Sequence, residues 1–121
     1  MEHSYYRKHE RIKSKTGIIL TSDGIFCKLM NLSKEGLFFR CIDNLEIPNE
    51  LYMDIHDMNI TSIEELQVEK VWVKQLNNIL VTPRSKSIFS FEVGGVFKNL
   101  SSTQRSQINS YLGRLIKMDN K

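Results

Sequence analysis

Two short motifs near the start of the chain contain the residue types that bind phosphates and purine bases. Arg7 and Arg11 form an R-x-x-x-R pair, and Asn31, Ser33 and Gly36 form an N-x-S-x-x-G pattern further along. A guanidinium offers a rigid fork of donors that matches phosphate oxygens and also the O6 and N7 edge of guanine. Asn31 and Ser33 add small hydrogen-bonding side chains at the end of a predicted strand. The two motifs together predict a site for a ligand that carries both phosphates and purine edges.

Each motif also has a purely structural interpretation. Asn, Ser and Gly are common turn residues, so a strand end followed by a turn explains the segment 31–36 equally well. If the segment binds a ligand, Asn31 and Ser33 hydrogen-bond guanine edges or backbone groups. Gly36 then either takes a positive φ or lets the ligand approach the backbone. The two arginines can likewise be part of a solvated basic leader.

The ordered motif pair resembles the pattern of the PilZ domain family, R-x-x-x-R followed by [D/N]-x-S-x-x-G. The resemblance runs from about Tyr6 to Leu115 and includes the strand around Val71-Trp72-Val73 and the stretch 91–97 before a final helix. It implies a six-stranded antiparallel β-barrel with a C-terminal α-helix, and cyclic di-GMP as the ligand.

The resemblance also implies a role for each motif residue. The ligand-binding residues would be Arg7, Arg11, Asn31, Ser33 and Gly36, with the two arginines gripping phosphates and guanines. The family pattern allows Asp or Asn at the first position, and Asn31 offers the guanine N–H groups a single carbonyl oxygen where Asp would offer only acceptors. We expect this difference to weaken binding without abolishing it.

Four further side chains are secondary candidates for ligand contacts, and each has an alternative. Tyr6 precedes the first arginine, where the resemblance implies an influence on whether one or two ligand molecules bind; it can equally be a free aromatic. Lys8 contacts a phosphate or is solvated. Arg40 stacks on a base or binds phosphate, or else lies on the surface. Trp72, the one tryptophan in the chain, stacks on guanine or fills the core.

The elements that must position these residues are short strands separated by turn residues. Ser22-Asp23-Gly24 lies between two apolar runs and predicts a hairpin, because glycine accepts the positive φ that such turns need. Leu51, Met53 and Ile55 alternate with polar residues at the period of a half-buried strand. The other predicted strands, all apolar or alternating, are 18–21, 25–29, 37–42, 66–75, 79–81 and 89–97. Strands at this spacing favour an all-β fold, and the resemblance favours a barrel over a sandwich.

A C-terminal helix is expected at about 102–117. Ser101 and Gln104 form an S-x-x-Q capping box before it. Its apolar stripe, which should dock on one end of the barrel, consists of Ile108, Tyr111, Leu112, Leu115 and Ile116. The segments expected to be irregular are 43–50, 58–65, 77–78 and 82–87. Gly94-Gly95 suggests a bulge or a tight bend in the last strand.

Composition is that of one globular domain of 121 residues with 40% hydrophobic and 26% charged residues. We expect residues 1–11 to be a flexible basic leader and 12–121 to be a single barrel domain. Cys27 and Cys41 lack C-x-x-C spacing and fall in strand patterns, which indicates buried thiols. There is no apolar run of the roughly 20 residues that span a bilayer, so we expect a cytoplasmic protein with no membrane insertion.

The net charge of +3 equals the excess of basic over acidic residues in segment 1–15, five against two, and the rest of the chain is balanced. This concentration favours a small anion over a long nucleic acid, which more often meets positive charge spread over a face. A solvated basic tail without a ligand explains the charge equally well.

The sequence predicts binding and not catalysis. It contains no recognisable nucleophile–base arrangement and no glycine-rich phosphate loop before a helix. Asp54, His56 and Asp57 could be drawn as a metal cluster, but only Asp54 and His56 share a strand face and no third ligand is evident, so no metal and no cofactor is expected. We therefore expect a stand-alone second-messenger receptor whose leader orders on binding cyclic di-GMP and changes the surface shown to an unidentified downstream protein. The alternative is a nucleotide-independent adaptor with the same fold that acts through protein contacts.

Overall fold

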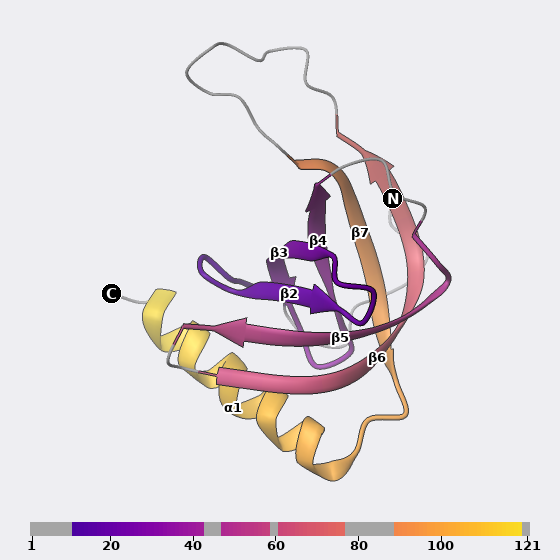
Figure 1. The fold of residues 1–121 in the computed structure, drawn as a ribbon. Helices are drawn as coiled ribbons and strands as arrows, with labels where there is room; N and C mark the ends of the chain where they lie inside the picture. The colour runs from indigo at the N-terminus through magenta and orange to yellow at the C-terminus, as the bar shows by residue number, and fades with distance from the viewer. Residues whose placement is uncertain (1–10, 43–46, 59–60, 77–88, 120–121) are drawn as a thin grey trace, which may run out of the picture.

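The computed structural model of the chain describes residues 11–42, 47–58, 61–76 and 89–119 (Figure 1). The elements in chain order are β1 (Ile12–Lys13), β2 (Ile18–Thr21), β3 (Phe26–Leu32), β4 (Gly36–Ile42), β5 (Glu50–Asp57), β6 (Thr61–Gln75), β7 (Phe89–Lys98) and α1 (Ser102–Asp119). The segments predicted at 77–78, 79–81 and 82–87, and most of the leader, lie outside the described residues. In the part that is described, no helix has the length and apolar character needed to cross a bilayer.

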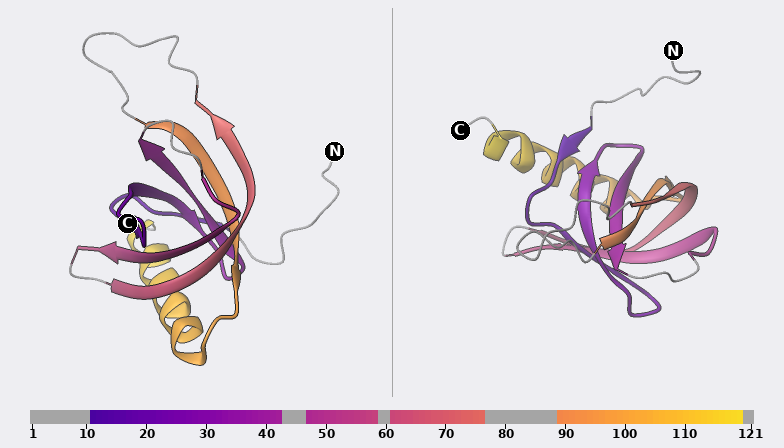
Figure 2. Two further views of the ribbon diagram at one scale, coloured as in Figure 1. Left: turned by 45° about the vertical axis from the view of Figure 1, so that its right-hand side comes forward. Right: turned by 90° about the horizontal axis from the view of Figure 1, so that it is seen from above.

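Six antiparallel strands close into a ring. Strand β2 pairs with β3 and β5, and the ring continues through β6, β7 and β4 until β4 returns to β3 (Figure 2). The short strand β1 is an addition that pairs with the end of β3, at Leu32 and Asn31. The predicted six-stranded antiparallel barrel with a C-terminal helix is therefore confirmed. A closed ring leaves few unpaired strand edges, which protects an all-β chain from edge-to-edge association.

The predicted hairpin between β2 and β3 is also confirmed. Gly24 has a φ of 85°, and its N–H donates to the carbonyl of Thr21 over 2.9 Å. Among the described glycines it is the one with a positive φ, so the turn requires glycine here for conformational reasons.

The start of β6 corrects one prediction. Residues 58–65 are expected to be irregular, yet β6 begins within this range. The alternation is broken by a β-bulge in which Glu65, at a φ of 58°, is an extra residue opposite Asp54. The buried positions Ile63 and Leu66 are consequently three residues apart. A period of two, which marks a strand in the sequence, is lost at this point.

The glycine pair in β7 lies at a bulge that belongs to the neighbouring strand. Strand β7 runs unbroken through Gly94 and Gly95, and from Phe91 to Val96 it keeps one register with β4. The extra residue is Val71 of β6, which lies between the partners of the two glycines. The sequence thus predicted the irregularity but placed it on the wrong strand.

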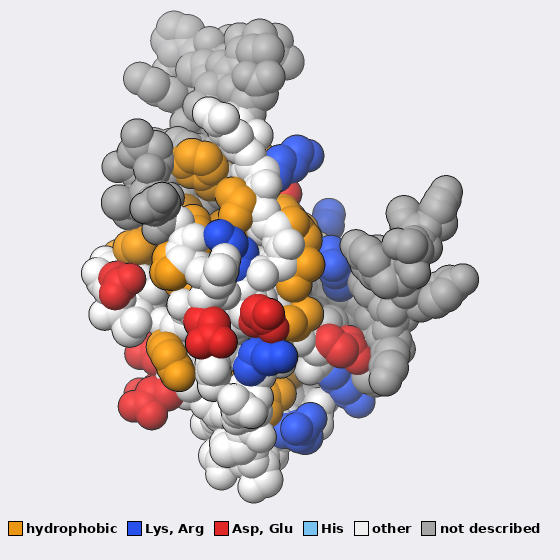
Figure 3. Space-filling view, turned by 90° about the vertical axis from the view of Figure 1, so that its right-hand side faces the viewer, with side chains coloured by type: hydrophobic (Ala, Val, Ile, Leu, Met, Phe, Trp, Pro, Cys, Tyr) orange, Lys and Arg blue, Asp and Glu red, His pale blue; other side chains and the backbone are white. Residues whose placement is uncertain are grey.

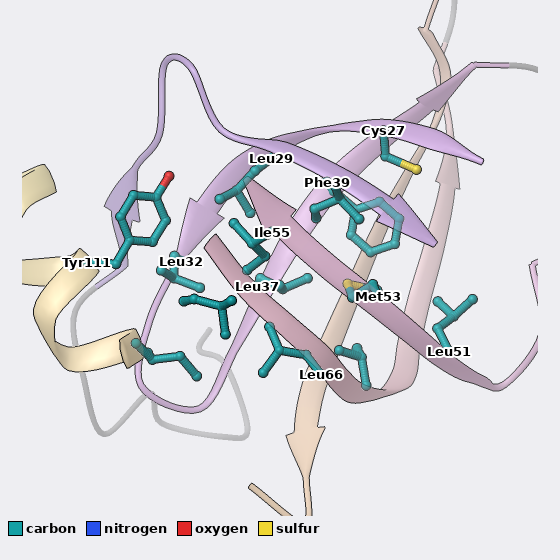
Figure 4. Packing of buried hydrophobic residues seen from close by; sticks show 14 of the residues in the cluster. Cys27, Leu29, Leu32, Leu37, Phe39, Leu51, Met53, Ile55, Leu66 and Tyr111 are labelled. Carbon is teal, nitrogen blue, oxygen red and sulfur yellow. The ribbon is translucent and has the colours of Figure 1, made fainter. Parts of the chain in front are cut away.

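The core fills the inside of the barrel with inward-facing side chains of the strands and of α1 (Figure 4). The largest side chains with at most 1% exposure are Phe39, Ile19, Leu29, Leu32, Met53, Ile55, Ile63, Leu66, Val68, Val93, Ile108 and Tyr111. Cys27 and Cys41 lie opposite each other on β3 and β4, with their sulfur atoms 3.5 Å apart, and both are buried free thiols as predicted. The contact with the Cys41 sulfur and burial together raise the pKa of Cys27.

Helix α1 covers one end of the barrel (Figures 1 and 2). Its capping box is formed as predicted: the N–H of Ser101 donates to Gln104 Oε1, and the N–H of Gln104 donates to Ser101 Oγ, both over 3.0 Å. The predicted stripe is buried except for Ile116, which is 44% exposed because it lies at the edge of the contact.

A buried polar cluster ties α1 to the barrel. The Tyr111 hydroxyl donates to Asp57 Oδ2 over 2.6 Å, and the Thr16 hydroxyl donates to the other oxygen of the same fully buried carboxylate. Burial, followed by the hydrogen bond to Asp57, raises the pKa of Tyr111. Because Asp57 is committed to these two hydroxyls, it is not part of an open ligand site.

Candidate ligand-binding surface

Strand registers align five residues in one row across the outer wall of the barrel. Lys13 lies opposite Asn31, Asn31 opposite Phe38, Phe38 opposite Gly94, and Gly94 opposite Trp72. Directly opposite residues of antiparallel strands project to the same side of the sheet. The two neighbours of Phe38 on β4 are buried in the core, so Phe38 and the whole cross-strand row face outward.

Two aromatic rings form the centre of this row. The ring centroids of Phe38 and Trp72 are 5.9 Å apart with an interplanar angle of 50°, which is within the range of favourable aromatic pairs. The indole lies directly on Gly94, because a Cβ at this glycine would be 2.2 Å from Trp72 Cε2. The indole is half-buried and lies on the outer wall, so Trp72 is not the core residue of the alternative prediction.

Arg11 extends over the same surface. Its guanidinium carbon is 5.6 Å from the centroid of the Phe38 ring, a cation–π arrangement. The reason is local: Arg11 immediately precedes β1, and β1 pairs with the strand that carries Asn31. The structure therefore brings the second arginine of R-x-x-x-R onto the same face as the start of N-x-S-x-x-G. Arg7, Tyr6 and Lys8 lie outside the described residues.

Ser33 holds a tight turn in place. Its N–H donates to the Gly36 carbonyl over 2.8 Å, and its Oγ accepts the N–H groups of Glu35 and Gly36 over 3.2 and 3.3 Å. The side chain is 6% exposed. Of the two roles predicted for Ser33, the structure shows bonding to backbone groups, and this fixes the turn beside Arg11.

One of the two roles predicted for Gly36 is wrong, because Gly36 has no positive φ. Packing requires glycine here: a Cβ would be 2.1 Å from the Gly95 carbonyl oxygen. A side chain at this position would push β4 away from β7. Gly36 thus acts on the surface indirectly, by letting the strand that carries Phe38 lie close to the strand that carries Gly94.

Asn31 has an available side chain. Its amide makes no hydrogen bond to any other residue that the structure describes. Since the residue is partly exposed and lies between Lys13 and Phe38, both the donor and the acceptor of the amide are accessible from the outer face.

Arg40 lies in the next row and is already paired. Its Nε donates to Glu92 Oε2 over 3.0 Å, and Glu92 is the opposite residue on β7. Lys28 and Lys74 flank the pair in the same row, on β3 and β6. A ligand phosphate would meet the lysines directly but would have to compete with Glu92 for Arg40.

Apolar side chains extend the surface around the aromatic pair. Val71 is 61% exposed and Val96 is 36% exposed, on the same β6–β7 wall as Trp72. The space-filling view of this side of the molecule shows apolar side chains interspersed with lysines, arginines and acidic groups (Figure 3). The exposed apolar side chains offer stacking faces to aromatic bases, and the basic side chains between them offer charges to phosphates.

Sequence reasoning missed Lys13, Phe38 and Gly94. The signal for Phe38 was available, because Leu37, Phe39 and Cys41 already supply the inward face of β4 and leave the residue between them to point outward. Lys13 and Gly94 had no such signal, since their places in the row depend on strand registers.

The described residues show no basis for metal binding, because no three potential ligands from His, Cys, Asp and Glu lie together among them. The Asp54 carboxylate accepts the N–H of Glu65, and His56 Nδ1 contacts the Ser62 hydroxyl over 3.2 Å. These side chains serve the β5–β6 pairing.

No protein-family model and no curated protein matches the chain. Among solved structures the chain is similar to the PilZ domain with c-di-GMP of YcgR from Escherichia coli, with 12% sequence identity, 95% of each chain covered and a TM-score of 0.74. At this identity the likeness shows the fold, and the fold is PilZ-like, as the motif resemblance implies.

Proposed function

We propose that this chain binds cyclic di-GMP on the outer wall of the barrel and acts as a stand-alone second-messenger receptor. The observation that carries the proposal is the position of Arg11: its guanidinium lies over Phe38, on the face that also carries Asn31 and adjoins the Ser33–Gly36 turn. Arg11 and Asn31, one residue from each motif and twenty residues apart in the sequence, therefore lie on one face, which supports the proposal. The likeness to a PilZ domain solved with c-di-GMP supports the same ligand.

Each part of the surface matches a part of the ligand. Arg11 and Arg7 bind phosphate oxygens or the O6 and N7 edge of a guanine. The Asn31 amide bonds a second guanine edge. Phe38 and Trp72 offer rings for a base to stack on, an interaction of ~1–3 kcal/mol per base. Tyr6, Lys8 and Arg40 make secondary contacts. The reaction is binding without catalysis, and it needs no cofactor.

Signalling in this proposal follows from the leader. The leader carries Arg7, so binding draws residues 1–10 onto the barrel and shifts the population toward the closed arrangement. A downstream protein then meets a changed surface. The ligand can favour the closed arrangement only through contacts that it makes in that arrangement. In this proposal the contacts with Arg7 and Arg11 provide this stabilisation.

Calorimetry of the full chain tests the proposal. We expect cyclic di-GMP to bind in the micromolar range, about −8 kcal/mol, with no binding of GTP or cyclic di-AMP. Arg11→Ala should lower the affinity about 30-fold, or ~2 kcal/mol, because a charge-assisted contact is lost. Arg105→Ala removes an exposed arginine from α1 and is the matched control, which should bind like the wild type.

Two results would count against this function. If the Arg7→Ala, Arg11→Ala double variant kept wild-type affinity, the binding surface would lie elsewhere. If excess cyclic di-GMP gave no thermal shift at all, the chain would be the nucleotide-independent adaptor, in which the same fold serves protein contacts only.

A further inference from the structure

A separate hollow of about 480 Å³ lies where the segment before β2 meets β3. Its lining residues are Lys15, Thr16, Gly17, Ile18, Phe26, Cys27, Lys28 and Met58. None of them belongs to the cross-strand row. The volume falls in the range that receives a drug-sized group or one or two protein side chains.

The walls of the hollow expose large apolar side chains. Phe26 is 58% exposed, Met58 77% and Ile18 43%. Lone exposed apolar residues are ordinary on a protein surface, but three around one concavity form a contiguous patch of the kind that marks an interaction site. The flexible methionine side chain also adapts to the shape of a docking group, and the phenylalanine ring offers a large apolar face.

The charged groups at the hollow have a single sign. Lys15 and Lys28 line it, and no Asp or Glu is among its lining residues. Lys28 is held beside the apolar wall because it lies directly opposite Ile18 in the β2–β3 pairing. An occupant with apolar groups alone would leave these ammonium groups without a counter-charge, whereas an acidic occupant would pair with them.

The same features distinguish between possible occupants. A second copy docked symmetrically through this face would gather four lysines, Lys15 and Lys28 from each copy, in one interface, and like charges gathered at an interface are unfavourable. A lipid surface is flat and would leave a concave site unfilled. An amphipathic segment of another protein can insert a side chain into the hollow and pair acidic residues with its lysines.

We propose that this hollow is a docking site for a partner protein, which inserts an apolar side chain from an amphipathic segment flanked by Asp or Glu. The hollow shares no residue with the cross-strand row, but Lys28 also lies beside Arg40 in the neighbouring row, so the docking site is tested on the chain without nucleotide.

The test uses phage-displayed random dodecapeptides, selected on the immobilised full chain without nucleotide. We expect the enriched peptides to contain Phe, Leu or Met close to Asp or Glu. The enriched peptides are then labelled with fluorescein and titrated with the protein while anisotropy is measured. Their affinity for Phe26→Ser or Met58→Ser should be at least tenfold lower than for the wild type. Tyr52→Ser is the matched control, because Tyr52 is 49% exposed but does not line the hollow.

Charge reversal provides an independent measurement. Lys15→Glu with Lys28→Glu should weaken acidic peptides and strengthen versions in which Asp and Glu are replaced by Lys. These are exposed or half-exposed side chains, and a circular dichroism melt of each variant checks that it folds.

The proposal is overturned if no peptide is enriched, if enriched peptides are basic, or if they bind Phe26→Ser as tightly as the wild type. Self-association of the chain that Phe26→Ser abolishes would assign the hollow to a second copy instead. Phe26-dependent binding to phosphatidylglycerol vesicles without peptide binding would assign it to a membrane surface.

Discussion

Gly94→Ala tests the aromatic surface without touching either motif. The new Cβ would lie 2.2 Å from Trp72 Cε2 and from Nε1, where carbon atoms normally approach to about 3.5–4.0 Å. The indole must therefore move by about 1.5 Å, and it can move only outward because Gly94 lies beneath it. The indole would then lose its contact with the Phe38 ring, and an aromatic pair of this kind contributes ~0.5–1.5 kcal/mol to stability.

The expected consequences are measurable with one reporter. Trp72 is the one tryptophan of the chain, so its emission should shift to the red as the ring enters solvent. Overpacking should destabilise the fold by about 1–3 kcal/mol, measured by urea unfolding. If a base stacks on the indole, the affinity for cyclic di-GMP should fall about tenfold, or ~1.4 kcal/mol, by calorimetry.

Gly113→Ala is the matched control for this experiment. A Cβ at Gly113 meets nothing within 4 Å, and the residue lies in the middle of α1. This variant should stabilise the helix by roughly 0.5–1 kcal/mol and leave both emission and affinity unchanged. Unaltered emission and affinity in Gly94→Ala would show that the indole does not lie on the glycine and would refute the reasoning.

Three further outcomes are expected. Tyr111→Phe removes the donor to the buried Asp57 carboxylate and should cost about 2 kcal/mol in urea unfolding at neutral pH, because hydrogen bonds to charged groups are the strong ones. The pKa of Tyr111 is raised in the folded state, so its contribution to the free energy of unfolding is complete below the ordinary pKa of about 10 and is lost as the pH rises further. Above pH 10 the free energy of unfolding of the wild type should therefore fall more steeply than that of Tyr111→Phe. Cys27 and Cys41 should react with a thiol reagent only at the rate of unfolding, and rapid labelling of the native chain would contradict their burial. Ser33→Ala leaves the N–H groups of Glu35 and Gly36 without their acceptor and should lower the free energy of unfolding by about 1 kcal/mol. A variant as stable as the wild type would contradict this role of Ser33.

The local features of the fold were readable from the sequence, because they depend on residues that are close along the chain. Asp23-Gly24 predicts its hairpin by backbone preference, and Ser101 with Gln104 predicts the start of α1 by reciprocal hydrogen bonds. Alternation predicts β5, and it failed at the start of β6 because the bulge at Glu65 interrupts the period.

Only the tertiary structure decided which residues share the candidate surface. The spacing of R-x-x-x-R and N-x-S-x-x-G identifies residue types that suit phosphates and purines, but it does not show that Arg11 lies over Phe38. That placement, and the position of Trp72 on Gly94, follow from the registers of five strands and the extra residue Val71. A shift of one residue in any of these pairings would turn a side chain to the opposite face. The sequence therefore determined the chemistry that is available, and the pairing of distant strands determined where it is assembled.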